Sequence, residues 1–405
     1  MTKDQLSQDQ LAHEQLSHDQ SVQQNPLPGH LQAQHVQAAP RPLLQPSMST
    51  VRLHGAHDLR LHDEAVPAHV PGEVFLKVQA VSVCGSDMHY YHEGGIGPAV
   101  IRRPMTPGHE FAATVMDGSG LPYGFADGTL VAVDPAQHCG QCEQCHAGYP
   151  NLCPNVHFLG SPGVDGGLAQ YISVRPSSLY AVPASFSPAL TALLEPLGVA
   201  VHALDITKIR PMSGVVVLGA GPIGLMIAQV AHVCGAAHVR VVEPRAARRA
   251  QALALGADSV HEDISEILEL TGGRGEDYVL EATNSPGAPE QAAQVARIGG
   301  RITLVGIPDG DHFQMSAANA RRKALIIKLS RRMGHVYPRA IELVRSGRVN
   351  IESIATHHYD MEGAVQAFKD AYDAPDGFLK AVIYPNGQPE NSQPNGSPGV
   401  PGPTM

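Results

Sequence analysis

The stretch "VVVLGAGPIGLMIAQ", residues 215–229, decides the fold of the second half of the chain. A buried-type apolar run, 215–218, leads into a G-x-G-x-x-G turn at Gly219, Gly221 and Gly224, and an apolar helical pattern follows. Glycines at this spacing permit a tight turn and a close approach of the backbone to a pyrophosphate, which the helix N-terminus attracts. The alternative is a glycine-rich turn that binds no ligand. We predict a dinucleotide site here.

Strand-like and helix-like patterns alternate after this turn. "HVRVVEP" (238–244), "DYVLEAT" (277–283) and "GGRITLVGI" (299–307) read as strands, and "RAARRAQALALGA" (245–257) reads as a helix. Strands that alternate with helices indicate a parallel sheet with helices on both faces. The predicted class is therefore α/β, with a doubly wound dinucleotide-binding domain over residues 201–335.

The second predicted strand ends on an acid, Glu243, nineteen residues after Gly224. A carboxylate at this position accepts hydrogen bonds from the adenosine ribose and repels a 2′-phosphate, so we expect NAD rather than NADP. The basic side chains of Arg245 and Arg248 lie close by in sequence and weaken this preference.

The flanking parts of the chain have a different character. Residues 49–196 hold short apolar runs such as "EVFLKVQAVSV" (73–83), broken by Gly and Pro, which predicts a β-rich domain. A helix at 337–349 and a strand at 379–385 are expected to return to it, so that this domain covers 48–200 and 336–386.

Both ends of the chain are predicted to be disordered tails. Residues 1–47 begin with a five-residue repeat rich in Gln, and five matches neither helical nor strand periodicity. Metal binding by the histidines of this tail is the alternative. Residues 387–405 are rich in Pro, Gly, Asn and Ser.

Composition excludes some classes of function. The chain has 405 residues with 28 Lys+Arg against 38 Asp+Glu, and a net charge of −10 argues against a nucleic-acid partner. No apolar run reaches the roughly 18–20 residues that cross a bilayer, and the polar N-terminus lacks a signal peptide's apolar core. We expect a cytoplasmic protein without a membrane partner.

Four of the six cysteines fall within fifteen residues, in "CGQCEQCHAGYPNLC" (139–153). Four thiolates at C-x₂-C-x₂-C-x₇-C spacing can surround a zinc ion and leave no position for water, which predicts a structural site. An iron–sulfur cluster or free thiols are the alternatives. The site residues are Cys139, Cys142, Cys145 and Cys153. Cys234 is expected to be a small core residue.

A second metal site is predicted from residues far apart in sequence. Cys84 supplies a thiolate, His109 an imidazole and Glu110 an adjacent carboxylate, while Glu195 lies in the apolar segment "LLEPLGVAVHA" (193–203). A carboxylate among leucines and valines is costly unless it is paired or metal-bound. Each residue alone has an ordinary structural explanation, as a buried thiol, a hydrogen-bonded core histidine or a helix cap.

The combination matches a family. The motifs "CGSDMH" (84–89), "GHE" (108–110), the four-cysteine segment, "EPL" (195–197) and "GAGPIG" (219–224) follow one another in the family's order. Over residues 50–385 the chain resembles the zinc-dependent medium-chain alcohol dehydrogenases. The loop 89–97 is similar to their polyol branch, which includes sorbitol, xylitol, arabinitol and L-idonate dehydrogenases.

The resemblance implies a GroES-like catalytic domain with one catalytic and one structural zinc, beside a Rossmann domain that binds NAD. It implies Cys84, His109 and Glu110 as catalytic zinc ligands, Glu195 as a ligand or the partner of a zinc-bound water, and a proton relay from Ser86 to His89. The positions that match the cofactor site are Gly219, Gly221, Ile223, Gly224, Glu243, Arg248, Val305 and Ile307. Those that match the substrate pocket are Tyr90, Ile96, Phe158 and Arg332.

The implied reaction transfers a hydride from a secondary alcohol of a polyol or sugar acid to NAD, with a small-molecule substrate and a homodimer or homotetramer. Arg331 and Met333, on either side of Arg332, depart from the polyol pattern and leave the identity of the polyol open. The alternatives are an L-threonine or 2,3-butanediol-type dehydrogenase and a non-catalytic relative that keeps the fold.

Overall fold

The computed structural model describes residues 46–388 of the chain. The two predicted tails lie almost entirely outside these residues. The first strand, β1, begins at Ser47, the last residue of the predicted N-terminal tail.

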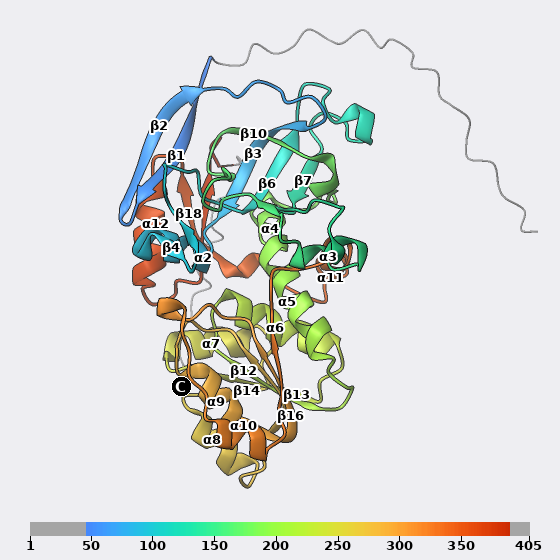
Figure 1. Cartoon of the computed structure of the whole chain (residues 1–405), viewed down its shortest axis with the longest axis vertical. Helices are drawn as coiled ribbons and strands as arrows, with labels where there is room; N and C mark the ends of the chain where they lie inside the picture. The colour runs from blue at the N-terminus through green and yellow to red at the C-terminus, as the bar shows by residue number, and fades with distance from the viewer. Residues whose placement is uncertain (1–45, 389–405) are drawn as a thin grey trace, which may run out of the picture. The chain divides into compact units, whose positions relative to one another are not determined.

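A seven-stranded mixed sheet forms the core of the upper half in Figure 1. Its strands follow the order β11-β7-β6-β3-β19-β18, and β10 also pairs with β3. The strands are β3 (Val74–Ser82), β6 (Glu110–Val115), β7 (Leu130–Val133), β10 (Tyr171–Val174), β11 (Leu179–Ala181), β18 (Ala355–Asp360) and β19 (Lys380–Tyr384). Since β19 pairs with β3, the end of the chain returns to the sheet formed by its first part.

Shorter elements surround this sheet. The hairpin of β1 (Ser47–Gly55) and β2 (Asp58–Ala65) forms its own two-stranded sheet. Two small strand pairs, β4 (Gly95–Ile96) with β5 (Ala99–Val100) and β8 (Ala136–Gln137) with β9 (His157–Phe158), shape the loops. The helices of this half are α2 (Gly85–Glu93), α3 (Glu143–His146), α4 (Pro188–Ala192), α11 (Tyr337–Arg345) and α12 (Ala364–Asp373).

The lower half contains a six-stranded, wholly parallel sheet in the order β14-β13-β12-β15-β16-β17. The order 3-2-1-4-5-6 is that of a doubly wound dinucleotide-binding fold, so the predicted α/β class is confirmed. The strands are β12 (Gly214–Leu218), β13 (His238–Val242), β14 (Ser259–His261), β15 (Glu276–Glu281), β16 (Ala296–Leu304) and β17 (Ile326–Leu329). The helices are α6 (Pro222–Val233), α7 (Ala246–Ala254), α8 (Ile264–Leu270), α9 (Ala288–Val295) and α10 (Ala317–Arg322).

Helix α5 (Leu194–Thr207) lies between the two sheets (Figure 1). Together with α4 it forms an apolar stretch of 20 residues with mean hydropathy 1.5, the length of a membrane span, but 78% of the apolar window is buried. Leu193, Leu194 and Leu197 are fully buried in the largest apolar cluster, with side chains from both sheets. We expected no apolar run of this length, and the burial shows that this stretch is a core helix.

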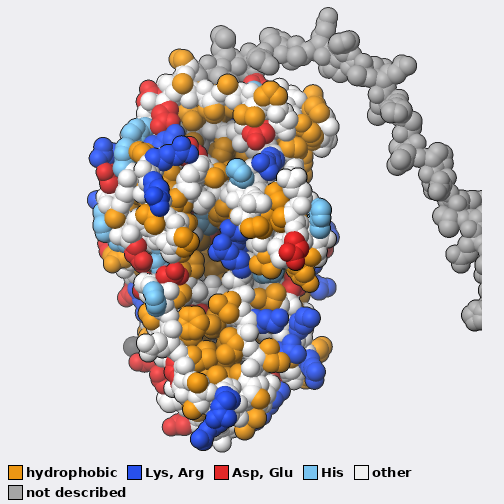
Figure 2. Space-filling model, viewed as in Figure 1, with side chains coloured by type: hydrophobic (Ala, Val, Ile, Leu, Met, Phe, Trp, Pro, Cys, Tyr) orange, Lys and Arg blue, Asp and Glu red, His pale blue; other side chains and the backbone are white. Residues whose placement is uncertain are grey.

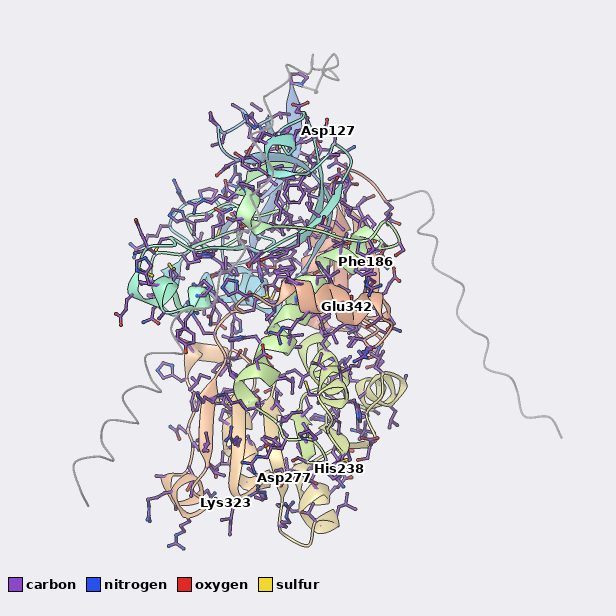
Figure 3. All side chains as sticks on the ribbon, turned by 90° about the vertical axis from the view of Figure 1, so that its right-hand side faces the viewer. Asp127, Phe186, His238, Asp277, Lys323 and Glu342 are labelled. Atoms are coloured by element: carbon purple, nitrogen blue, oxygen red, sulfur yellow. The ribbon has the colours of Figure 1, made fainter. Side chains whose placement is uncertain are left out.

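The parallel strands point their carboxyl ends toward the other sheet. Figure 3 labels His238, the first residue of β13, and Asp277, near the start of β15, at the far lower end of the sheet. The loops that follow β12, β15 and β16 therefore meet at the edge nearest the seven-stranded sheet. We propose the domain boundaries given above on the basis of this division.

Candidate active site

Cys84, His109 and Glu110 come together where two antiparallel strands meet. Ser82, at the end of β3, is paired with Glu110, at the start of β6, so a thiol two residues beyond β3 lies beside His109 and Glu110. Ligand atoms of Cys84, His109 and Glu110 all lie within 4.8 Å of one another. Gly108 makes the turn possible, because its φ is +90° and a Cβ there would come 2.7 Å from Cγ1 of Val81.

His109 is buried and faces a carboxylate. Its Nδ1 lies 3.7 Å from Oδ1 of Asp87, too far for a hydrogen bond, and both atoms are buried without a hydrogen-bond partner. The other Asp87 oxygen accepts a 3.0 Å hydrogen bond from the backbone N–H of Cys84. Burial lowers the pKa of His109, but the neighbouring Cys84 and Asp87 charges outweigh it and raise this pKa well above the usual value. A carboxylate behind an imidazole is the arrangement that orients metal-ligating histidines.

Glu110 already has two partners. Its carboxylate forms an ion pair with the buried ammonium of Lys380, with Nζ 2.8 Å from Oε1 and 2.7 Å from Oε2, and Oε2 also accepts a hydrogen bond from the Ser82 hydroxyl. A metal would share this acid with Lys380. Glu110 is therefore compensated in charge before any metal binds.

Glu195 is the buried acid without a partner. Only 6% of the residue is exposed, and no described residue donates a hydrogen bond to its carboxylate. Burial raises the pKa of Glu195 to about 8, with His109 opposing and Glu110 reinforcing the shift. Its oxygens lie outside the 4.8 Å group formed by Cys84, His109 and Glu110, although it interacts electrostatically with two of them. This position suits a residue that contacts a zinc-bound water better than one that binds the metal directly.

The thiol, imidazole and carboxylates fit a zinc ion by their chemistry. Zinc binds Cys, His and Asp or Glu, and a catalytic site keeps one position for substrate. The buried cluster offers all three donor types.

The relay residues lie on α2, which Cys84 caps at its N-terminus. The Ser86 hydroxyl lies 3.4 Å from the Cys84 sulfur. One turn later, Nδ1 of His89 lies 3.0 Å from a carboxylate oxygen of Glu93, and the imidazole is largely buried. Ser86 and His89 are three residues apart, so they share one face of the helix.

The four clustered cysteines gather as predicted. Their sulfurs are separated by 3.5 Å (Cys142–Cys145 and Cys139–Cys153) and 3.8 Å (Cys142–Cys153), and all four ligand atoms form one group. A zinc tetrahedron with Zn–S bonds of about 2.3 Å has edges of about 3.8 Å. All six cysteines of the described residues are free thiols, so no disulfide explains the short sulfur–sulfur distances. The distances are those of a metal site. Cys234, expected in the core, is instead exposed, because it is the C-cap of α6.

The glycine turn lies at the carboxyl end of β12 and opens α6. A Cβ on Gly224 would come 2.0 Å from the carbonyl oxygen of Gly219, so the helix can pack this closely only with glycine. A Cβ on Gly221, the N-cap, would meet no atom within 4 Å, which leaves the space a pyrophosphate needs.

Glu243 follows β13 and is buried. One of its oxygens accepts a 2.9 Å hydrogen bond from the backbone N–H of Ala220, within the glycine turn. The guanidinium of Arg248 has a buried Nε without a partner, and burial lowers its pKa. The Arg245 guanidinium donates instead to the carbonyl of Ala374, while the Arg245 backbone N–H donates a 3.0 Å hydrogen bond to Glu243.

Two protein-family models match most of the described chain. Residues 70–184 match the alcohol dehydrogenase GroES-like domain, and residues 222–346 match the zinc-binding dehydrogenase domain. A sorbitol dehydrogenase from Bacillus subtilis (strain 168) is 34% identical over 345 residues, which are 84% of this chain and 98% of that protein. The chain belongs to the zinc-binding dehydrogenase family.

Solved structures agree with this assignment. An alcohol dehydrogenase from Escherichia coli CFT073, complexed with NADH, is 26% identical with a TM-score of 0.76, covering 84% of this chain and 100% of the other. The 2R,3R-butanediol dehydrogenase from Bacillus subtilis is 29% identical with a TM-score of 0.75 over the same shares of the two chains. Zinc and a nicotinamide dinucleotide are thus the cofactors of this zinc-binding dehydrogenase.

Ring contacts connect two of the four predicted substrate residues, Phe158 and Arg332, with His109. The Phe158 ring centre is 5.3 Å from that of His109, and the guanidinium carbon of Arg332 is 5.4 Å from the Phe158 centre. Tyr90 is buried on α2, and Ile96 lies in β4.

Met333, which we expected to bear on the identity of the polyol, lies elsewhere. It is 4% exposed and packs against α5, where a Cβ on Gly198 would come 2.3 Å from its sulfur. A side chain in this core position does not line the substrate pocket.

Sequence reasoning missed four side chains that organise this dehydrogenase site. They are Ser82, Asp87, Glu93 and Lys380. Asp87 lies within the quoted "CGSDMH" motif, and Lys380 is a lone charge in an otherwise apolar strand. A lysine in a fully buried strand needs an anionic partner, and that was the available signal.

Proposed function

We propose that this protein is a cytoplasmic, zinc-dependent polyol dehydrogenase that oxidises a secondary alcohol of a polyol or sugar acid with NAD. The observation that carries the proposal is the largely buried group of Cys84, His109 and Glu110, beside Glu195, to which no residue in 46–388 donates a hydrogen bond. When bound there, zinc acts as a Lewis acid that favours loss of the proton from a substrate hydroxyl.

The side chains of this chain would then transfer the proton, position the zinc ligands, exclude water and bind the dinucleotide. Ser86 accepts the hydroxyl proton, and His89, held by Glu93, passes it toward solvent. Asp87 places a carboxylate behind His109, and Lys380 pairs with Glu110 and holds it in place. Phe158 and Tyr90 exclude water beside the reacting carbon, while Ile223, Val305 and Ile307 would hold the nicotinamide dinucleotide.

The buried carboxylate of Glu243 supports NAD rather than NADP, because it would repel a 2′-phosphate. We also propose a homodimer or homotetramer built through the cofactor domains. Strand β17 is one of the two edges of the six-stranded sheet and exposes Ile326 and Leu329, which an identical edge would cover.

The experiment is NAD reduction at a fixed enzyme concentration across xylitol, sorbitol, arabinitol, L-idonate, L-threonine and 2,3-butanediol. The proposal predicts the highest kcat/KM on polyols or the sugar acid. The likeness to the butanediol dehydrogenase favours a vicinal-diol enzyme as the second candidate. A preference for butanediol or threonine would replace the polyol proposal with that candidate. No turnover of any compound by zinc-loaded protein would indicate a non-catalytic relative.

A further inference from the structure

Two adjacent arginines lie on the segment that joins β17 to α11. Asn151 holds this segment, because its side-chain amide donates a 3.1 Å hydrogen bond to the carbonyl of Arg331. In return, Nη1 of Arg332 donates a 3.2 Å hydrogen bond to the carbonyl of Asn151. Arg332 adopts φ +53°, a left-handed conformation that costs a non-glycine residue energy and that the surroundings therefore maintain.

The Arg332 guanidinium lies one aromatic ring away from His109. It lies over the Phe158 ring, and that ring contacts His109. Burial and the neighbouring Arg331 lower the pKa of Arg332 to about 10, so it is still charged at neutral pH. The Phe158 ring thus separates the positive charge of Arg332 from His109.

Neither guanidinium has an acidic partner within residues 46–388. Ion pairs hold many other arginines of this chain, among them Arg52, Arg240 and Arg339, but none involves Arg331 or Arg332. The side chain of Arg331 is exposed and makes no hydrogen bond with a described residue. The acids Glu93 and Asp309 group with His89 instead.

Two adjacent like charges, one of them partly buried, are unfavourable unless an anion binds them. Figure 2 shows basic side chains beside the hollow between the upper and lower parts of this face, and in Figure 1 the segment between β17 and α11 crosses the same region. Guanidinium groups bind carboxylate and phosphate oxygens in a bidentate manner, and neutral hydroxyls less strongly.

We propose that the preferred substrate is a polyol that carries an anionic group, a carboxylate or a phosphate, which Arg331 and Arg332 bind while the hydroxyl to be oxidised lies at the metal cluster. This inference rests on the proposed function and narrows it. In this inference Arg331 determines the preference for anionic over neutral polyols. Arg332 binds both the anionic group and the hydroxyls of the substrate.

The first test compares neutral and anionic substrates on zinc-loaded wild-type protein with saturating NAD. The neutral arm is xylitol and sorbitol, the carboxylate arm is L-idonate and D-gluconate, and the phosphate arm is sorbitol 6-phosphate and galactitol 1-phosphate. We expect kcat/KM for one anionic arm to exceed the neutral arm by about tenfold or more, the equivalent of one charge-assisted contact. That advantage should shrink as ionic strength rises. The set of substrates that shows this advantage identifies the anionic group as a carboxylate or a phosphate.

The second test uses Arg331→Leu, with Arg331→Lys as the charge-retaining variant. The matched control is Arg322→Leu, which removes an exposed arginine from α10 at the lower end of Figure 1. Arg331→Leu should lower kcat/KM for the anionic substrate about tenfold and leave the neutral polyols and the KM for NAD within about twofold. Arg331→Lys should restore part of the loss, and the control should change neither substrate.

Equal or better turnover of neutral polyols by the wild type would overturn this inference and leave the proposed function standing. An equal loss on both substrate classes in Arg331→Leu would overturn it as well. Absence of turnover with every polyol, neutral and anionic, would instead refute the proposed function. Should Arg331→Leu not fold, the ionic-strength dependence of the wild-type preference decides the question.

Discussion

Lys380 and Glu110, 270 residues apart, form a fully buried ion pair at 2.7 Å, and Glu110 is at the same time a member of the Cys84–His109 group. β19 is the strand that makes this possible, because it pairs with β3 beside β6 and brings its first residue to the site. The pairing of β19 with β3 therefore supplies the cation that faces Glu110.

Removal of Lys380 should be costly. Lys380→Met leaves the buried Glu110 carboxylate without its cation, and breaking a buried pair from one side costs about 3–5 kcal/mol. Urea unfolding of the zinc-loaded protein measures this loss. Lys380→Arg keeps the charge and should lose less. A loss below about 1 kcal/mol for Lys380→Met would contradict the pairing.

Glu195 should make the metal-free protein less stable as pH rises. Its folded pKa of about 8 lies above the ordinary 4.5, so the folded state retains a proton that the unfolded state releases between these values. The free energy of unfolding should therefore fall from pH 4.5 to about 8. The loss due to this residue should be on the order of a few kcal/mol.

Glu195→Gln, stripped of metal by a chelator, isolates this contribution, because Gln cannot titrate. The difference in unfolding free energy between wild type and variant should change across pH 4.5–8, with the wild type losing more. A pH-independent difference would show that Glu195 titrates normally. With zinc bound, the dependence should weaken, since the metal stabilises the carboxylate.

The four-cysteine site should hold a zinc that supports the fold. Cys145→Ser removes one of four sulfurs within 4.8 Å of one another. We expect elemental analysis to find about one zinc fewer per chain, and the melting temperature to fall by several degrees. Cys234→Ser is the matched control, because Cys234 is exposed and outside the cluster. Unchanged zinc content in Cys145→Ser would contradict the site.

Most of the fold could be predicted from short local patterns in the sequence. The glycine turn at 219–224 was recognisable because Gly224 packs against the carbonyl of Gly219, a contact that only glycine allows. The four-cysteine spacing was similarly informative, because all four ligands come from one short segment. In both cases the constraint lies within fifteen residues or fewer, and a sequence displays such constraints directly.

Constraints between distant segments were harder to predict. The pairing of Lys380 with Glu110 depends on sheet order, and the exposure of Cys234 depends on where α6 ends. Met333 was noted only as a departure from the polyol pattern, and the structure packs it against Gly198, where the segment before α11 turns at Arg332. The direction of a side chain on an irregular segment follows from backbone angles that no residue pattern encodes.

The most direct test of the account replaces the thiol that caps α2. Cys84→Ser should lose the catalytic zinc and at least about 99% of polyol-dependent NAD reduction, because the Lewis acid is gone. The affinity for NADH, measured by fluorescence titration, should stay within about twofold, since the dinucleotide turn at Gly219–Gly224 is untouched. Full polyol oxidation by a Cys84→Ser protein would show that this group of side chains does not perform the reaction.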